Sequence, residues 1–228
     1  MSYRFALFDA DNTLLDFSRA EREALSDCLA ARGLRHDEIV TTRYAAINDA
    51  QWKRLEQGLT TRKALQVDRF TLLAEEFAFS LDPLSLLSDY MEALSQKTYL
   101  MAGAEELILA VKDYCRLFII TNGTLEVQRP RLARCPLMAH FERVFISEEV
   151  GANKPERAFF EHVFSSIPDF RPEEALVIGD SLTSDIRGGA AAGLATCWFA
   201  PDGRRAPGDI SIMHTVRSLA EIVPLLIE

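Results

Sequence analysis

Apolar residues along this chain gather in five short runs, and longer stretches of helix-forming residues separate them. The runs are rich in β-branched, aromatic and aliphatic side chains, which favour buried strands. They are Phe5–Phe8, Leu117–Thr121, Arg143–Ser147, Ala175–Gly179 and Ala195–Phe199. Strands that alternate with helices pair in parallel through right-handed crossovers. The pattern therefore predicts an α/β fold with a central parallel sheet that helices cover on both faces.

More than a hundred residues separate the first two runs, far too many for one crossover connection. From about residue 17 to residue 97 good helix formers dominate, with breaks at Gly33, Gly58 and Pro83. The expected helices are Glu21–Arg32, Arg43–Gln57, Lys63–Phe77 and Pro83–Gln96. We therefore expect a helical subdomain over residues 17–97, inserted into a core made of residues 1–16 and 98–228.

The composition narrows the classes of function. A chain of 228 residues with 48% hydrophobic content can bury a sizeable core. With 34 acidic and 25 basic residues, its net charge of −9 disfavours binding to nucleic-acid polymers or anionic membranes. We find no secretion signal, no membrane-spanning run and no paired cysteine spacing, and these features favour a cytoplasmic protein with free thiols. A small-molecule substrate is expected, and no oligomeric state is predicted.

Reactive or phosphate-binding residue types follow four of the five apolar runs. Because the carboxyl ends of parallel strands lie at one edge of a sheet, these residues should meet in one crevice. In chain order they are Asp9 and Asp11, then Thr121, Asn122 and Gly123, then Lys154, and finally Asp180 and Asp185. The spacing thus predicts a site with four carboxylates, a lysine, a hydroxyl and exposed backbone amides.

Four clustered carboxylates need cations. Two like charges about 4 Å apart repel by roughly 4 kcal/mol at an effective dielectric near 20, and Lys154 offsets only one charge of the four. Ligands that are all oxygen, with room for several waters, suit Mg²⁺ better than Zn²⁺. We predict Mg²⁺ bound by Asp9 and Asp180, with Asp185 acting as a ligand or orienting the others.

The positions of these residues suggest roles in phosphoryl transfer. Asp9, the first residue after its strand, can attack phosphorus as a nucleophile. Asp11 can protonate the leaving alcohol and then accept a proton from water. The hydroxyl of Thr121, the amides of Asn122 and Gly123, and the Lys154 ammonium can hold the phosphoryl oxygens. A turn or a helix cap is the structural alternative for each aspartate.

At these residues the chain resembles the haloacid dehalogenase superfamily. The resemblance covers essentially the whole chain and rests on four motifs in order. They are Asp9-Ala10-Asp11-Asn12-Thr13, Thr121-Asn122-Gly123, Lys154-Pro155, and Gly179-Asp180-Ser181-Leu182-Thr183-Ser184-Asp185. It implies a Rossmann-like core, a helical cap of the first insertion type (C1), an aspartyl-phosphate intermediate and Mg²⁺. It also implies that the backbone carbonyl of Asp11 is a metal ligand.

The chain is further similar to the YjjG-like pyrimidine 5′-nucleotidases. The similar segments are residues 146–151, 184–189 and 192–198, together with a cap pattern of Asn48, Trp52, Gly58 and Arg69-Phe70. This resemblance implies hydrolysis of pyrimidine nucleoside monophosphates, including deoxy forms, with the cap closing over the base. Phe17, Asn48 and Trp52 are the candidate substrate contacts, although a tryptophan in an amphipathic helix is more often a core residue.

Three other functions fit the same fold. One is a phosphatase for another small ester, such as phosphoglycolate or a sugar phosphate. Another is a dehalogenase acting at carbon, against which Asp11 argues, because a departing halide needs no proton. The last is a catalytically silent binding protein, and the retention of all four motifs argues against it.

Overall fold

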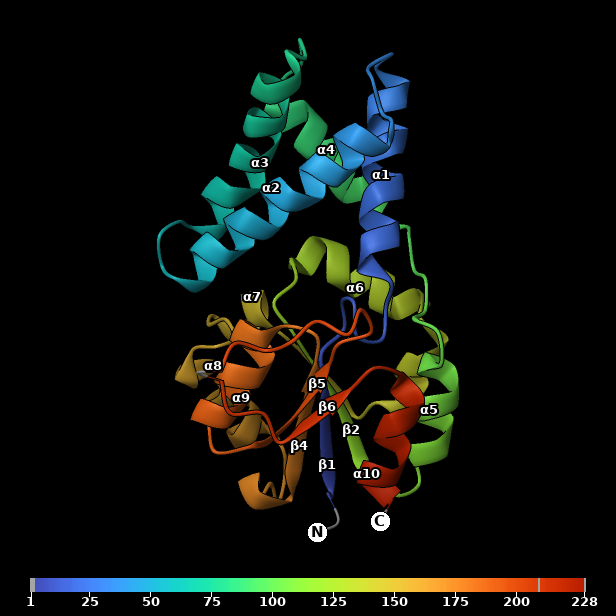
Figure 1. The fold of residues 1–228 in the computed structure, drawn as a ribbon, viewed down its shortest axis with the longest axis vertical. Coiled ribbons are helices and arrows are strands. Elements are labelled where there is room, and N and C mark those ends of the chain that lie inside the picture. Colours follow the sequence, from blue (N-terminus) through green and yellow to red (C-terminus); the bar gives the residue numbers. More distant parts are fainter. Residues whose placement is uncertain (1–2, 209, 228) are drawn as a thin grey trace.

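Six parallel strands form one sheet in the computed structural model, which describes residues 3–208 and 210–227. The spatial order of the strands is β3-β2-β1-β4-β5-β6 (Figure 1). The strands are β1 Phe5–Phe8, β2 Arg116–Thr121, β3 Arg143–Ile146, β4 Ala175–Gly179, β5 Ala195–Phe199 and β6 His214–Val216. All five predicted strands are confirmed, with bounds that differ by at most one residue.

The sixth strand, β6, was not predicted from the sequence. Its three residues alternate between partly buried, exposed and buried positions, so they do not form an apolar run. The strand pairs only with β5, through registers such as Cys197 opposite His214 and Phe199 opposite Val216. An edge strand of this kind is defined by its neighbour and not by its own composition.

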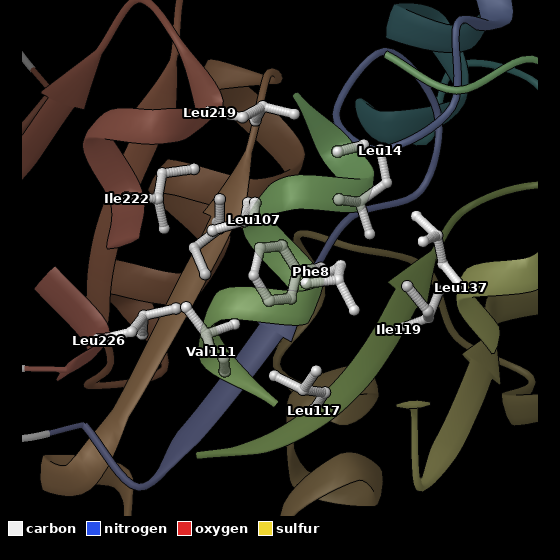
Figure 2. Packing of buried hydrophobic residues seen from close by; sticks show 14 of the residues in the cluster. Phe8, Leu14, Leu107, Val111, Leu117, Ile119, Leu137, Leu219, Ile222 and Leu226 are labelled. Carbon is white, nitrogen blue, oxygen red and sulfur yellow. The ribbon is translucent and has the colours of Figure 1, made fainter. Parts of the chain in front are cut away.

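Alternate residues of the central strands pack into separate hydrophobic clusters on the two faces of the sheet. In β1, Ala6 and Phe8 face one cluster, whereas Phe5 and Leu7 face the other. Figure 2 shows the first cluster, in which Phe8 lies among leucine, isoleucine and valine side chains. Because both faces are buried, these strands read as continuous apolar runs, which is why the sequence located them well.

Shorter helices cover the two faces of the sheet. Figure 1 places α5 and α10 on one side of the strands and α8 and α9 on the other. The helices outside residues 17–97 are α5 Ala104–Val111, α6 Leu125–Arg134, α7 Ser147–Val150, α8 Arg157–Ser166, α9 Gly188–Ala191 and α10 Val223–Ile227. A short π-helical segment, Leu182–Arg187, follows β4. No helix of the described residues is long and apolar enough to cross a membrane.

Four long helices lie beyond the carboxyl ends of the strands (Figure 1). These are α1 Phe17–Ala31, α2 Glu38–Glu56, α3 Arg62–Phe77 and α4 Pro83–Ser95. All four predicted helices are confirmed. The first two begin four and five residues earlier than predicted, because Asp16 and Asp37 cap their free amides. We call residues 17–97 the helical insert.

The helical insert has a hydrophobic cluster of its own. Stacked and edge-to-face contacts join the rings of Tyr44, Phe70 and Tyr90 at its centre. The two segments that lead into and out of the insert pair with each other. The amide of Asp16 donates to the carbonyl of Tyr99 at 2.9 Å, and the amide of Met101 donates to that of Leu14 at 2.9 Å. The insert is therefore attached to the sheet through a short, paired base.

Candidate active site

Lys154 and two aspartates form a buried ion cluster at the carboxyl end of the sheet. The Lys154 ammonium lies 2.7 Å from Asp9 Oδ1 and 2.6 Å from Asp185 Oδ1. It also donates to the carbonyl of Ile120 at 2.8 Å, so all three of its hydrogens have acceptors. The side chains of Lys154 and Asp185 are each only 1% exposed. The structure thus brings together residues 145 positions apart in the chain, as their places after β1 and β3 predicted.

Local geometry explains the positions of Asp185 and Lys154 in this cluster. A Cβ atom on Gly179 would lie 2.2 Å from Asp185 Oδ2, so only glycine lets that carboxylate lie over the end of β4. The amide of Ser181 donates to the same oxygen at 3.1 Å. Asn122 binds the backbone of Lys154 twice, accepting from its amide and donating to its carbonyl, each at 2.8 Å. The Asn122 side chain therefore positions the lysine.

The cluster carries more acid than its lysine can neutralise. Burial raises the pKa of Asp9 well above its usual range; Asp185 and Asp180 add to the shift, and Lys154 opposes it. Burial and Asp185 likewise raise the pKa of Asp180 to about 7. For Lys154 burial acts against the charge, but the two aspartates outweigh it and raise the pKa of the ammonium. Protons or a cation must therefore offset the remaining negative charge.

Three carboxylates could hold such a cation. Asp9, Asp180 and Asp185 each offer an oxygen, and these oxygens lie within 4.8 Å of one another. No histidine or cysteine belongs to this group. An all-oxygen donor set beside buried, partly uncompensated charge fits a hard divalent ion such as Mg²⁺. We refer to Asp9, Asp180, Asp185 and Lys154 as the acidic cluster.

Asp11 faces the same cavity but is held by different partners. Arg131 Nη1 donates to its Oδ1 at 2.6 Å, and Gln128 Nε2 donates to its Oδ2 at 2.6 Å. The sequence indicated Lys154 as offsetting one charge of the four acids and pointed to no second cation, but the fully buried Arg131 supplies one beside Asp11. The sequence missed it since α6 was not predicted as part of the site. Two cations, Lys154 and Arg131, thus pair directly with three of the four aspartates at the sheet edge.

Thr121 and Gly123 lie beneath the Gln128 side chain. Gln128 Nε2 donates to Thr121 Oγ1 at 3.0 Å, and the Gly123 amide donates to the same hydroxyl at 3.2 Å. A Cβ atom on Gly123 would lie 2.2 Å from Gln128 Cγ. Glycine is therefore required here for the amide side chain to cross the loop and reach Asp11.

A cavity of about 390 Å³ connects the acidic cluster to the helical insert. This volume falls within the roughly 300–1,000 Å³ typical of small-molecule sites. Every residue predicted for the site lines the cavity, including Phe17, Asn48 and Trp52 of the insert. The structure therefore places the three candidate substrate contacts where a ligand of the acidic cluster would meet them.

The insert side of this cavity carries a polar network of three buried residues, which we call the insert wall. Asn48 Nδ2 donates to Glu21 Oε1 at 2.7 Å, and Arg69 Nη1 donates to Asn48 Oδ1 at 2.9 Å. Burial raises the pKa of Glu21 to about 7, although Arg69 and Asn48 oppose the shift. Glu21 and Arg69 were not predicted as site residues, since they lie on α1 and α3 with no shared sequence motif.

Polar contacts close the insert onto the sheet edge. Arg62 at the start of α3 donates to the Asn122 carbonyl at 2.9 Å and to Ser147 Oγ at 2.7 Å. Thr183 Oγ1 donates to Glu56 Oε2 at 2.6 Å. These contacts join both ends of the α2–α3 turn to the segments that follow β2, β3 and β4.

Comparisons with known proteins are consistent with this geometry. Residues 3–193 match the family model for haloacid dehalogenase-like hydrolases. The chain is 39% identical to the pyrimidine 5′-nucleotidase PynA of Streptococcus pneumoniae, over 88% of this chain and 85% of PynA. It is 32% identical to the pyrimidine 5′-nucleotidase YjjG of Escherichia coli, over 99% of both.

A third relative, YfnB of Bacillus subtilis, has a known structure. The sequences are 37% identical over 98% of this chain and 95% of YfnB. The chain superposes with a TM-score of 0.94 on a crystal structure of YfnB bound to magnesium, which reveals interdomain movement in that protein. The alignment covers 99% of both chains at 36% identity. The expected Rossmann-like fold is thus shared along nearly the whole length of both chains.

Proposed function

Since this chain belongs to the haloacid dehalogenase-like hydrolase family, we propose that it is a Mg²⁺-dependent 5′-nucleotidase for pyrimidine nucleoside monophosphates. The observation that carries the proposal is the acidic cluster, in which Lys154 joins Asp9 and Asp185 at the floor of a cavity of ligand size. Similarity to PynA and YjjG supports the nucleotide as substrate. Residues 1–16 and 98–228 would form the catalytic core, and residues 17–97 the cap.

The first chemical step in this proposal is attack by Asp9 on phosphorus. An Asp9 oxygen forms a bond to phosphorus as the bond to the 5′ oxygen breaks, and Asp11 gives that oxygen a proton. Water then attacks the aspartyl-phosphate, Asp11 accepts its proton, and the electron pair returns to Asp9. Thr121, the amides of Asn122 and Gly123, and Lys154 would hold the phosphoryl oxygens.

The donor set of the acidic cluster supports Mg²⁺ as the cofactor, and the magnesium bound in the YfnB crystal structure is in keeping with it. Asp9, Asp180, Asp185 and the carbonyl of Asp11 would hold the ion. Bound there, Mg²⁺ would offset the negative charge of the acids and of the phosphate dianion. Without the ion, the single positive charge of Lys154 would leave an excess of negative charge on the three neighbouring carboxylates.

The insert wall supports a pyrimidine base as the group that enters the cap side of the cavity. Glu21 presents a buried acceptor, and Arg69 Nη2 has only a long contact to Met91 Sδ, at 3.8 Å, so it can still donate. Pyrimidines offer carbonyl acceptors and an amino or ring N–H donor along one edge. Asn48 would orient both groups, and Trp52 and Phe17 would contact the sugar or base.

A kinetic screen at fixed Mg²⁺ tests the proposal. The purified chain is assayed for phosphate release from pyrimidine and purine nucleoside monophosphates, in ribo and deoxy forms, and from sugar phosphates and phosphoglycolate. We expect kcat/KM for pyrimidine nucleotides to exceed that for sugar phosphates by at least about tenfold. EDTA should abolish release, and added Mg²⁺ should restore it. Equal kcat/KM values for sugar phosphates and nucleotides would refute the proposal that nucleotides are the substrates. Turnover in EDTA would refute the proposed dependence on Mg²⁺.

A further inference from the structure

Asp11 is oriented by helix α6 rather than by the residues of the acidic cluster. Both of its carboxylate oxygens accept hydrogen bonds from that helix, one from Arg131 and one from Gln128. Gln128 Oε1 in turn accepts from Arg131 Nη1 at 3.0 Å, so the two donors also hold each other. Each carboxylate oxygen has two acceptor positions, and one on each remains open for a proton.

Arg131 is also joined to both segments that connect the helical insert to the sheet. Its Nε donates to the carbonyl of Lys97 at 3.1 Å, and its guanidinium lies 5.5 Å from the centre of the Phe17 ring. Its own carbonyl accepts from Thr98 Oγ1 at 3.2 Å. Phe17 opens the insert, and Lys97 closes it. One side chain thus touches both ends of the insert and the carboxylate at the reacting centre.

The environment of Arg131 does not suggest a purely structural role. The side chain is 0% exposed, and its Nη2 is buried without a hydrogen-bond partner. A buried guanidinium with an unused donor is costly, and a structural role alone would favour full pairing. The residue lines the same cavity as Asp11. Its Nη1 and Nε together join Asp11, Gln128 and the Lys97 carbonyl, and this link gives a reason for burying the guanidinium.

We propose that Arg131, with Gln128, is the positioning residue for Asp11, and that it ties the orientation of this acid to the closure of the insert. The inference rests on the proposed function, in which Asp11 protonates the leaving oxygen. Movement of either connecting segment would shift the guanidinium through Lys97 or Phe17. Proton delivery would then be available only when the insert lies over the substrate.

The leaving group provides a sharp test. A series of aryl phosphates from p-nitrophenyl to phenyl phosphate keeps the size of the ester similar while the departing oxygen becomes more basic. An acidic nitrophenol leaves without a proton, whereas phenol or a nucleoside needs one. We expect Arg131→Met to lower kcat/KM about 30-fold for phenyl phosphate and about threefold or less for p-nitrophenyl phosphate, since general acids contribute about 10²–10⁴-fold.

Two further variants complete the test. Arg131→Lys keeps a cation but loses the guanidinium that reaches both Asp11 and the Lys97 carbonyl, so it should restore part of the rate on phenyl phosphate. This variant remains measurable if the methionine variant fails to fold. Arg134→Met is the matched control, because Arg134 on the same helix donates to the carbonyl of Ser95, which lies in the insert, and forms no hydrogen bond or ion pair with Asp11 in the described part of the chain. It should leave the ratio of the two rates unchanged. The ratio itself does not depend on the fraction of folded enzyme.

Asp11→Asn separates this inference from the proposed function. Suppose that Asp11→Asn selectively lowers kcat/KM for phenyl phosphate, whereas Arg131→Met lowers kcat/KM equally for both esters. The positioning role of Arg131 is then wrong, and the acid role of Asp11 stands. If Asp11→Asn shows no selectivity, the proposed mechanism itself is wrong. A rise in KM for nucleotides alone in Arg131→Met, with an unchanged aryl ratio, would make Arg131 a substrate contact and would overturn the proposal.

Discussion

The acidic cluster and the insert wall face each other across one cavity, but their charges are balanced in different ways. In the acidic cluster a lysine lies between two aspartates, a third aspartate is close by, and negative charge is in excess. In the insert wall an amide separates one glutamate from one arginine, so negative charge is not in excess. The first arrangement calls for a cation and a phosphate, whereas the second can hydrogen-bond a neutral group. Under the proposed function, this difference would give the sheet edge the chemistry and the insert the choice of substrate.

Loss of the nucleophile should have the largest effect, and the loss of turnover should be the same for every substrate. Asp9→Asn removes the attacking oxygen and a candidate metal ligand together, so turnover should fall by at least about 10³-fold. The factor should be the same for nucleotides and p-nitrophenyl phosphate, because the leaving group does not touch Asp9. Phosphate-release assays with both substrates measure it. Asp113→Asn, an exposed carboxylate paired with Lys112, is the control. Activity close to that of the unmodified chain would rule out the mechanism.

A change in the insert wall should have a smaller and selective effect. Asn48→Ala leaves Glu21 and Arg69 without their shared partner. KM for pyrimidine nucleotides should therefore rise about tenfold, which corresponds to the loss of roughly one hydrogen bond to the base. For p-nitrophenyl phosphate, which has no base, kcat/KM should change by about twofold or less. Lys53→Ala, on the exposed face of the same helix, should change neither value. Equal losses on the two substrates would show that the wall supports the cap and does not select the base.

A third effect concerns the stability of the fold, not its activity, and depends on pH. The pKa of Glu21 is about 7 in the folded chain and about 4.5 when unfolded, so the folded state binds the proton more tightly. Stability from this group is present below pH 4.5 and is lost as pH rises towards 7, by up to about 3 kcal/mol. Glu21→Gln does not titrate and should gain stability relative to the unmodified chain between pH 5 and pH 8.

Urea denaturation at several pH values measures this difference. The midpoint curves of Glu21→Gln and the unmodified chain should diverge as pH rises, whereas Glu75→Gln, at an exposed position of the insert, should follow the unmodified curve. Parallel curves for Glu21→Gln would mean that this carboxyl is not protonated in the wall. The carboxylate would then be ionised beside Arg69, and the raised pKa on which this prediction depends would have to be abandoned.

The strands and the acidic cluster could be predicted from the sequence because each depends on local pattern plus one topological rule. Buried strands such as β1 and β4 are continuous apolar runs, and parallel strands end at a common edge. Asp9 and Asp180 follow those runs directly. Their meeting needed no knowledge of how individual side chains pack. β6 was missed because a three-residue edge strand has no such pattern.

Side chains on helices were harder to place. Gln128 and Arg131 are three residues apart on α6 and face Asp11 together, a spacing that fits one face of a helix. That polar pair, soon after Thr121-Asn122-Gly123, is the signal that could have found them. Glu21 and Arg69 offered none, since they lie on α1 and α3 and meet only through Asn48 on α2.

The sequence by itself determined the parallel α/β core, the four helices of the insert and the acidic residues at the strand ends. The spacing of hydrophobic residues and the order of the strands along the chain are sufficient to predict these features. Only the tertiary structure decided that Arg131 holds Asp11 and that three insert helices share one polar network. Such contacts depend on the angle at which helices cross and on which rotamers fill the space between them. Neither is encoded in the spacing of residues along the chain.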